Sequence, residues 1–117
     1  MSTFNEQLQS VLQRIQQKQA QERREEQLRK MIIEQIHQDF QNVLYPLQRT
    51  YNLSDYVNRG DRFSFTLNGI KLTITRDDIV SRALGDESEE LHLEQLSVLD
   101  YKSTIQNAIL DELSKQL

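Results

Sequence analysis

The chain has 117 residues, of which 37% are apolar and 27% charged, and its formal net charge is −4. This length suits one domain with an appendage. The absence of cysteine excludes a disulfide framework, a thiolate metal site and a cysteine nucleophile, and it fits a reducing compartment. No apolar run approaches the roughly 20 residues of a membrane span. Since the N-terminus also lacks a signal pattern, we expect a cytoplasmic protein.

Charge is distributed unevenly along the chain. Residues 1–30 carry six Lys or Arg and four Glu, whereas residues 86–117 carry eight acidic residues and two Lys. Ends of opposite sign favour docking of one on the other, within a chain or between chains. The acidic balance of the whole chain argues against general nucleic-acid binding.

Residues 3–50 are rich in Gln, Glu, Arg, Lys and Leu and contain no Gly, which predicts a long helix. Thr3 and Glu6 have the spacing of a capping box at its start. Pro46 should end or kink this helix near residues 44–45. Within the helix, two apolar blocks share one heptad frame and are separated by about three polar turns.

The first apolar block is the strongest candidate for a binding surface. An apolar stripe of this length has little to bury against outside a small domain, so we expect contact with a protein, including another copy of this chain. The polar face beside it is Gln-rich with only two basic residues, which argues against a membrane surface. The predicted partner-binding residues are Phe4, Leu8, Val11, Leu12 and Ile15.

The polar gap that follows admits two interpretations. Its seam positions, Gln19, Glu22, Glu26 and Arg29, belong either to a solvated helical connector or to a helix pair that tolerates polar seam residues for register. We favour the connector, because i,i+4 pairs worth about 0.3–0.5 kcal/mol each keep such a helix intact.

The second block is wider than a coiled-coil seam, which is typical of a helix in a globular core. Its members are Leu28, Met31, Ile32, Ile33, Ile36, Phe40, Val43, Leu44 and Leu47. We therefore predict a projecting amphipathic, coiled-coil-like helix over residues 1–27 and a small α+β domain over residues 28–117. The turn-rich stretch that runs on to Asp61 is expected to hold one short helix.

The segment over about residues 62–75 predicts a β-hairpin. Asn68-Gly69 suits the type I′ turn, which needs positive φ at both central residues. A two-residue loop makes opposed residues share a face, so the six apolar side chains of the hairpin should line one side. An isolated hairpin is marginally stable in water, so helices must cover that side.

Three further segments complete the chain. Thr75 and Asp78 have N-cap spacing for a helix over residues 77–84, which Gly85 should close. The acidic run over residues 86–90 is expected to be a loop, and residues 91–98 fit either a third strand or a helix. The last helix should be capped by Asp100, with an apolar stripe made of Tyr101, Ile105, Ala108, Ile109 and Leu113.

Catalytic chemistry has little support in this sequence. It has two histidines, and it lacks a Gly-rich phosphate loop and the glycines that surround a hydrolase nucleophile. Glu34 and His37 form E-x-x-H, which is half of a di-iron site, but such a site also needs Glu from other helices. A histidine satisfied at the core boundary is the favoured interpretation. We expect neither an enzyme nor a bound cofactor or metal.

The sequence thus predicts a mainly helical α+β protein that acts as a non-catalytic interaction module, an adaptor or structural assembly protein that forms homo-oligomers through its N-terminal helix. The alternative is a small acidic inhibitor or chaperone that occludes a basic surface of a partner. Its patch would be Asp86, Glu87, Glu89, Glu90 and Glu94. A weaker alternative is nucleic-acid binding, although Glu residues interleave the basic cluster and no aromatic residue accompanies it. That cluster consists of Arg23, Arg24, Arg29 and Lys30.

Overall fold

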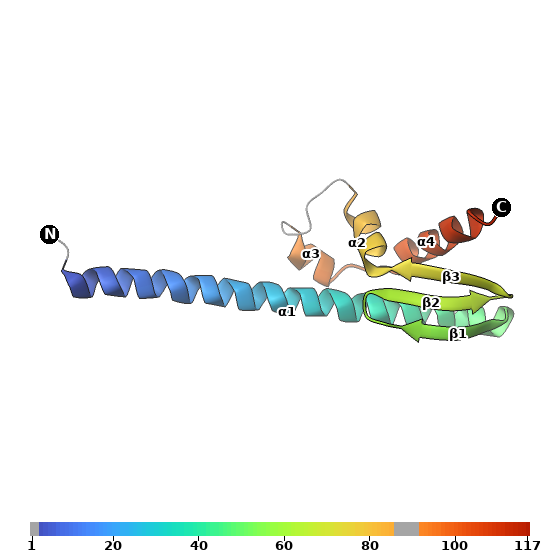
Figure 1. Ribbon diagram of the computed structural model, residues 1–117, viewed down its shortest axis with the longest axis horizontal. Helices are drawn as coiled ribbons and strands as arrows, with labels where there is room; N and C mark the ends of the chain where they lie inside the picture. Colours follow the sequence, from blue (N-terminus) through green and yellow to red (C-terminus); the bar gives the residue numbers. More distant parts are fainter. Residues whose placement is uncertain (1–2, 86–91) are drawn as a thin grey trace.

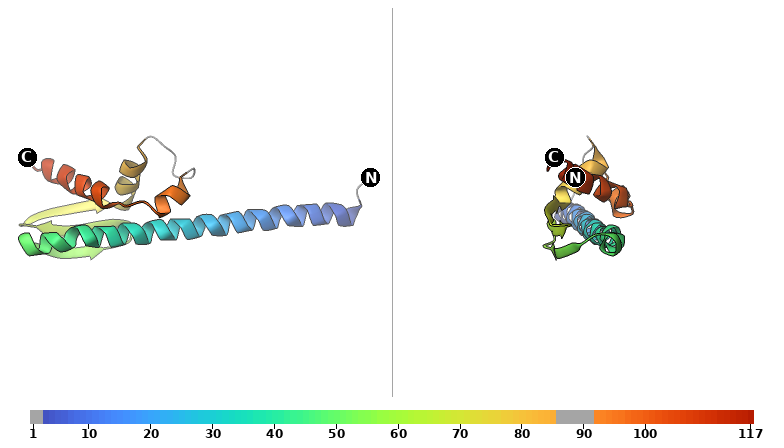
Figure 2. Two further views of the ribbon diagram at one scale, coloured as in Figure 1. Left: turned by 180° about the vertical axis from the view of Figure 1, so that it is seen from behind. Right: turned by 90° about the vertical axis from the view of Figure 1, so that its right-hand side faces the viewer.

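A computed structural model describes residues 3–85 and 92–117, with the element order α1–β1–β2–β3–α2–α3–α4 (Figure 1). The molecule measures 74 × 25 × 19 Å and has a radius of gyration of 20.5 Å. A compact domain of this length would have a radius of gyration of about 13 Å. The excess comes from α1, whose N-terminal part projects far beyond the other elements (Figures 1 and 2). The predicted mainly helical α+β class is confirmed.

Helix α1 spans Phe4–Thr50 without interruption. It begins as predicted, because the Thr3 hydroxyl oxygen accepts a hydrogen bond from the Glu6 N–H at 3.2 Å. This bond satisfies one of the first-turn donors that a helix leaves unpaired. Both apolar blocks and the polar gap therefore lie on one continuous helix.

Of the two effects expected of Pro46, an end of α1 near residues 44–45 is wrong, since the helix continues to Thr50, and a kink stays a prediction. Proline removes one helical hydrogen bond, the one that would reach the carbonyl of Asn42. Asn42 and Pro46 are both exposed, so water can satisfy the freed carbonyl. Beyond the proline, Leu47 packs against the core, and its carbonyl accepts from the Tyr51 N–H at 2.8 Å.

Strands β2 (Arg62–Leu67) and β3 (Ile70–Thr75) form the predicted hairpin. The register is the expected one, with three opposed apolar pairs on one face. The turn residues Asn68 and Gly69 have φ values of 49° and 82°, as a type I′ turn requires. Five of the six apolar side chains are buried and Ile70 is exposed. The buried residues are Phe63, Phe65, Leu67, Leu72 and Ile74.

A third strand, β1 (Leu53–Asn58), lies where a turn-rich stretch with a short helix was expected. It pairs antiparallel with β2, and the sheet order is β1-β2-β3. A bulge shifts the register between Ser54 and Val57, and Asp55 within it has a φ of 57°. The two half-buried residues of this strand, Leu53 and Tyr56, are consequently three positions apart instead of two. The bulge breaks the alternation by which a strand is recognised in sequence.

The second half of α1 covers the apolar face of the sheet. Phe40 is central to the contact, stacking on Phe63 at a centroid distance of 4.3 Å and meeting Phe65 edge-on at 5.9 Å. The buried face of α1 is narrower than expected, because Met31 and Ile33 are exposed. The buried apolar residues of α1 are Ile32, Ile36, Phe40, Val43 and Leu44, and the partly buried Leu28 and Leu47 pack against the same core.

Helix α2 (Arg76–Leu84) follows the hairpin as predicted. The Thr75 hydroxyl oxygen accepts from the Asp78 N–H at 3.1 Å, and Gly85 ends the helix with a φ of 66°. The acidic run over residues 86–90 lies outside the described residues, as does Leu91. The next described element is helix α3 (Leu93–Ser97), so a third strand through Leu93 is wrong and the helical alternative is confirmed.

Helix α4 (Lys102–Ser114) completes the fold. Tyr101 occupies the N-cap position, and Asp100 still makes a capping contact because its carboxylate accepts from the Lys102 N–H at 2.9 Å. The predicted stripe of α4 is buried at Tyr101, Ile105, Ala108 and Ile109, and Leu113 is partly buried.

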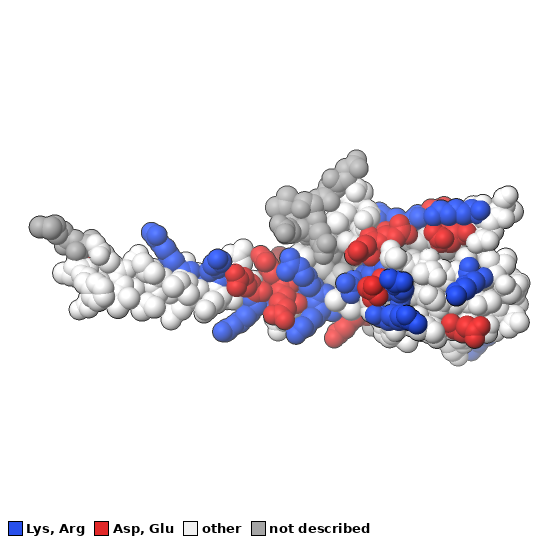
Figure 3. All heavy atoms as spheres, viewed as in Figure 1, with Lys and Arg blue, Asp and Glu red and all other residues white. Residues whose placement is uncertain are grey.

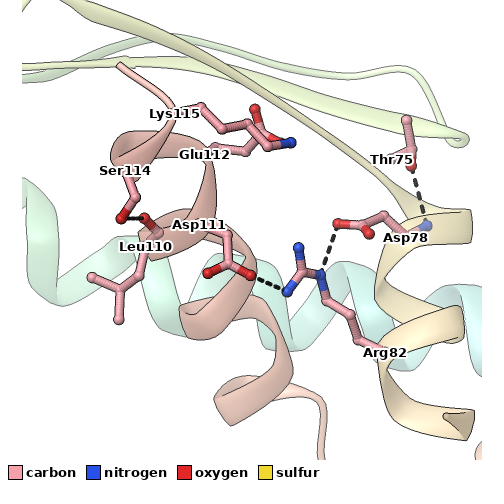
Figure 4. A network of polar contacts seen from close by, with 8 residues as sticks. All are labelled: Thr75, Asp78, Arg82, Leu110, Asp111, Glu112, Ser114 and Lys115. Carbon is pink, nitrogen blue, oxygen red and sulfur yellow. Dashed lines mark hydrogen bonds and ion pairs between the residues drawn. The ribbon is translucent and has the colours of Figure 1, made fainter. Parts of the chain in front are cut away.

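Two polar contacts attach α4 to other elements. The Tyr101 backbone N–H donates to the carboxylate of Asp39 on α1 at 2.8 Å, and the Asp39 side chain is buried. The second contact joins α4 to α2, where Arg82 of α2 lies between Asp78 of its own helix and Asp111 of α4 (Figure 4). These hydrogen bonds, first to Asp111 and then to Asp78, raise the pKa of the Arg82 guanidinium, so the bridge stays charged. α4 is thus fixed to α1 and α2 by charged groups as well as by its apolar stripe.

Candidate protein-interaction surface

The N-terminal part of α1, residues 4–27, is here called the arm, and its apolar residues are called the arm stripe. The stripe consists of Phe4, Leu8, Val11, Leu12 and Ile15, which are 74%, 44%, 50%, 48% and 47% exposed. They lie at three- and four-residue spacings, so they form one band about 18 Å long on the helix. In the described residues, the rest of the fold leaves this band open to solvent (Figure 1).

The arm stripe carries no charge, in contrast to the segment that follows it. Figure 3 shows an almost uncharged N-terminal end, then mixed basic and acidic side chains along the middle of the molecule. Along that middle segment the seam is polar, and α3 packs beside it. The arm therefore separates into an apolar tip and a charged stem. This arrangement suits the solvated connector, while the division of domains after residue 27 stays a prediction.

The predicted basic cluster begins in this charged stem with Arg23 and Arg24 and continues just beyond the arm with Arg29 and Lys30. Arg24 forms an ion pair with Glu94 of α3, and Lys30 pairs with Glu26 at 3.6 Å. The Arg24–Glu94 contact joins the basic N-terminal region to the acidic C-terminal region, as the charge asymmetry suggested. Because both side chains are about two-thirds exposed, with 67% and 70% of their surfaces accessible, the pair adds little stability.

The acidic patch is the least defined of the candidate sites. Asp86, Glu87, Glu89 and Glu90 lie outside the described residues, and Glu94 is the one member that the structure places. Its carboxylate is directed at Arg24. The patch therefore remains a sequence-based hypothesis.

The E-x-x-H pair lies beside the sheet. His37 contacts the side-chain amide of Asn58 on β1, and Glu34 lines the same hollow of about 500 Å³. A di-iron site would need further Glu ligands from other helices, for which Glu94 and Glu112 are the candidates. Glu94 pairs instead with Arg24, and Glu112 pairs with Lys115. No cluster of three or more His, Asp or Glu that could hold a metal is found in the part of the chain that the structure describes.

Two features had no signal in the sequence. One is the buried carboxylate of Asp39, which also accepts from the Gln35 amide at 3.0 and 3.1 Å. The other is a hollow of about 450 Å³ on the outer face of the sheet, which arises because β1 adds its residues beside the hairpin. Arg59, Arg62 and Lys71 line this hollow, together with the acidic Asp55. One of these basic residues, Arg62, also pairs with Asp61 at 3.8 Å.

Comparison with known proteins adds no assignment. The chain matches no protein-family model, no curated protein and no solved structure. Within residues 3–85 and 92–117, no helix has the length and apolar character needed to cross a membrane. The candidate surface with the clearest physical basis is therefore the arm stripe.

Proposed function

We propose that this chain is a non-catalytic structural module that self-associates through the arm stripe. At the other end of the arm it carries the sheet, helices α2–α4 and the second half of α1, which together are called the α/β part. The observation that carries this proposal is the exposure of five apolar side chains, between 44% and 74%, on one band of a continuous helix. A reducing compartment such as the cytoplasm is the proposed setting, supported by the absence of cysteine.

The arm stripe favours association because it is costly to leave in water. Full burial of a Leu, Ile, Val or Phe side chain contributes about 1.5–3 kcal/mol, and these side chains have realised about half of that within the monomer. The α/β part cannot cover them, since it packs on the opposite end of the same straight helix (Figure 2). A partner from outside the monomer is the remaining source of cover.

A second copy of the chain matches the stripe in length and chemistry. Its own stripe is uncharged and has heptad spacing, so two stripes can interlock as knobs and holes without any repulsion. The surface is small beside the roughly 1,200–2,000 Å² of stable interfaces, which implies a reversible, concentration-dependent association. Such a module would link two α/β parts into one assembly as its local concentration rises.

Sedimentation equilibrium of the full chain over a range of concentrations tests the proposal. The informative variant is Leu12→Glu, which places a charge in the stripe. Gln13→Glu is the matched control, because it introduces the same charge one residue along, on the far side of the helix. We expect wild type and Gln13→Glu to shift from monomer to dimer together, while Leu12→Glu stays monomeric. A monomeric wild type, or equal association of both variants, would contradict the proposal.

A further inference from the structure

We infer that two copies pair antiparallel through their arms, so that the two α/β parts lie at opposite ends of the assembly. This inference rests on the proposed self-association and adds the orientation of the partner. It follows from the side of α1 on which the arm stripe lies and from the charges that follow the stripe along the seam.

The arm stripe lies on the same side of α1 as the sheet. At 3.6 residues per turn, positions 36 residues apart are separated by about ten turns and point in the same direction. Phe4 is related in this way to Phe40, and Leu8 to Leu44. Phe40 and Leu44 are 0% and 4% exposed, because the sheet and its neighbours cover them. A partner helix seated on the arm stripe therefore approaches from the side that carries the sheet.

This placement obstructs a parallel pair. Packed helices keep their axes about 8–10 Å apart. A parallel, in-register partner would place its own sheet on its facing side, so both sheets would have to fit between two helices at that spacing. A sheet alone needs about 10 Å to pack against one face. The antiparallel pair has no such conflict, because each α/β part lies beyond the N-terminal end of the other arm.

The seam charges favour the same orientation. Past Ile15 the seam continues through Gln19, Glu22, Glu26 and Arg29. In a parallel pair each of these residues faces its own copy, which sets Glu against Glu and Arg against Arg and destabilises the pair. An antiparallel overlap is confined to about residues 4–19, where the apolar band of one copy meets the apolar band of the other.

Distances between spin labels on the full chain distinguish the orientations. Because the chain has no cysteine, Gln9→Cys and Gln27→Cys each provide one label site, and both positions are exposed on α1. They are 18 residues, or about five turns, apart, so both labels project to the same side, away from the stripe. In an antiparallel pair the label-to-label distance should be at least about 25 Å longer at residue 27 than at residue 9, given a rise of 1.5 Å per residue on each helix. In a parallel pair the two distances should be equal.

Each outcome has one meaning. A longer distance at residue 27 supports the antiparallel pair. Equal short distances at both positions overturn the orientation and leave self-association standing. The absence of any intermolecular distance at high concentration overturns self-association as well. Adding Leu12→Glu to each labelled chain should abolish both distances, and their survival would show that the copies meet through a different surface, which overturns both proposals.

Discussion

The two apolar blocks of α1 have similar sequence patterns and opposite environments. Residues 32–47 lie under the sheet, with Phe40 stacked on Phe63 at 4.3 Å. Residues 4–15 stand in solvent on the same helix, and Phe4, which points to the same side as Phe40, is 74% exposed. The difference shows that an apolar stripe on a helix indicates that the stripe is to be buried, but does not indicate which surface buries it. One block is covered by its own chain, and the other is left for a partner.

The two halves of α1 also differ in what stabilises them. The second half of α1 is held by tertiary packing, whereas the arm relies on helix propensity and on its continuity with that packed half. Interactions that matter to the fold should therefore be concentrated in the covered half. Interactions that matter to association should be concentrated in the arm.

Truncation of matched aromatic residues should separate the two halves most strongly. Phe40→Ala removes a fully buried ring, and we expect it to lower the free energy of unfolding by about 3–5 kcal/mol. Phe4→Ala should change that value by less than about 0.5 kcal/mol under dilute, monomeric conditions. Urea denaturation monitored by circular dichroism measures both. Equal losses would mean that the arm stripe is covered in the monomer.

A smaller effect is expected at Asp39, the polar anchor of the covered half. Asp39→Ala leaves the buried Tyr101 N–H without its acceptor and should cost about 1–3 kcal/mol. Asp39→Asn keeps an oxygen in place and should cost less. Urea denaturation of the two variants checks the order. An equal loss in both would mean that the carboxylate charge, and not the hydrogen bond, is what α4 requires.

The smallest effect should appear at alkaline pH. Burial raises the pKa of Tyr56 above its ordinary value of 10.0, and its buried hydroxyl has no hydrogen-bond partner among the residues that the structure describes. Because the folded state holds this proton more tightly than the unfolded state, stability should be full below pH 10.0 and should fall as the pH rises through the folded-state pKa. Tyr56→Phe should weaken this fall and leave stability at neutral pH unchanged or slightly higher. Thermal unfolding at pH 8–11 provides the measurement, and an unaltered pH profile in the variant would exclude Tyr56 as its source.

Local patterns predicted much of this fold. The hairpin register follows from Asn68-Gly69 and strict alternation, and α2 follows from the spacing of Thr75, Asp78 and Gly85. Strand β1 escaped prediction because its bulge replaces a period of two by a spacing of three. Helix α1 continues through Pro46 because Asn42 and Pro46 are exposed, and the local sequence does not indicate that exposure.

In the candidate site, too, the sequence predicted some features and missed others. The heptad spacing of its apolar residues was enough to predict the arm stripe. Its exposure followed because the chain offers no second apolar surface near the arm. The contact between Asp39 and Tyr101 joins residues 62 positions apart, so no local pattern reveals it. The orientation of the proposed pair depends on which side of α1 carries the sheet, and no local sequence pattern gives that side.

The most direct test of self-association through the arm is the maximum dimension of the full chain, measured by small-angle X-ray scattering over a concentration series. One copy is 74 Å long. An overlap of about 16 arm residues shares about 24 Å of helix, so the pair should reach about 120 Å. We expect the dimension to rise toward that value with concentration in wild type and in Gln13→Glu, and to stay near 74 Å in Leu12→Glu. A wild-type dimension near 74 Å at every concentration would contradict the account.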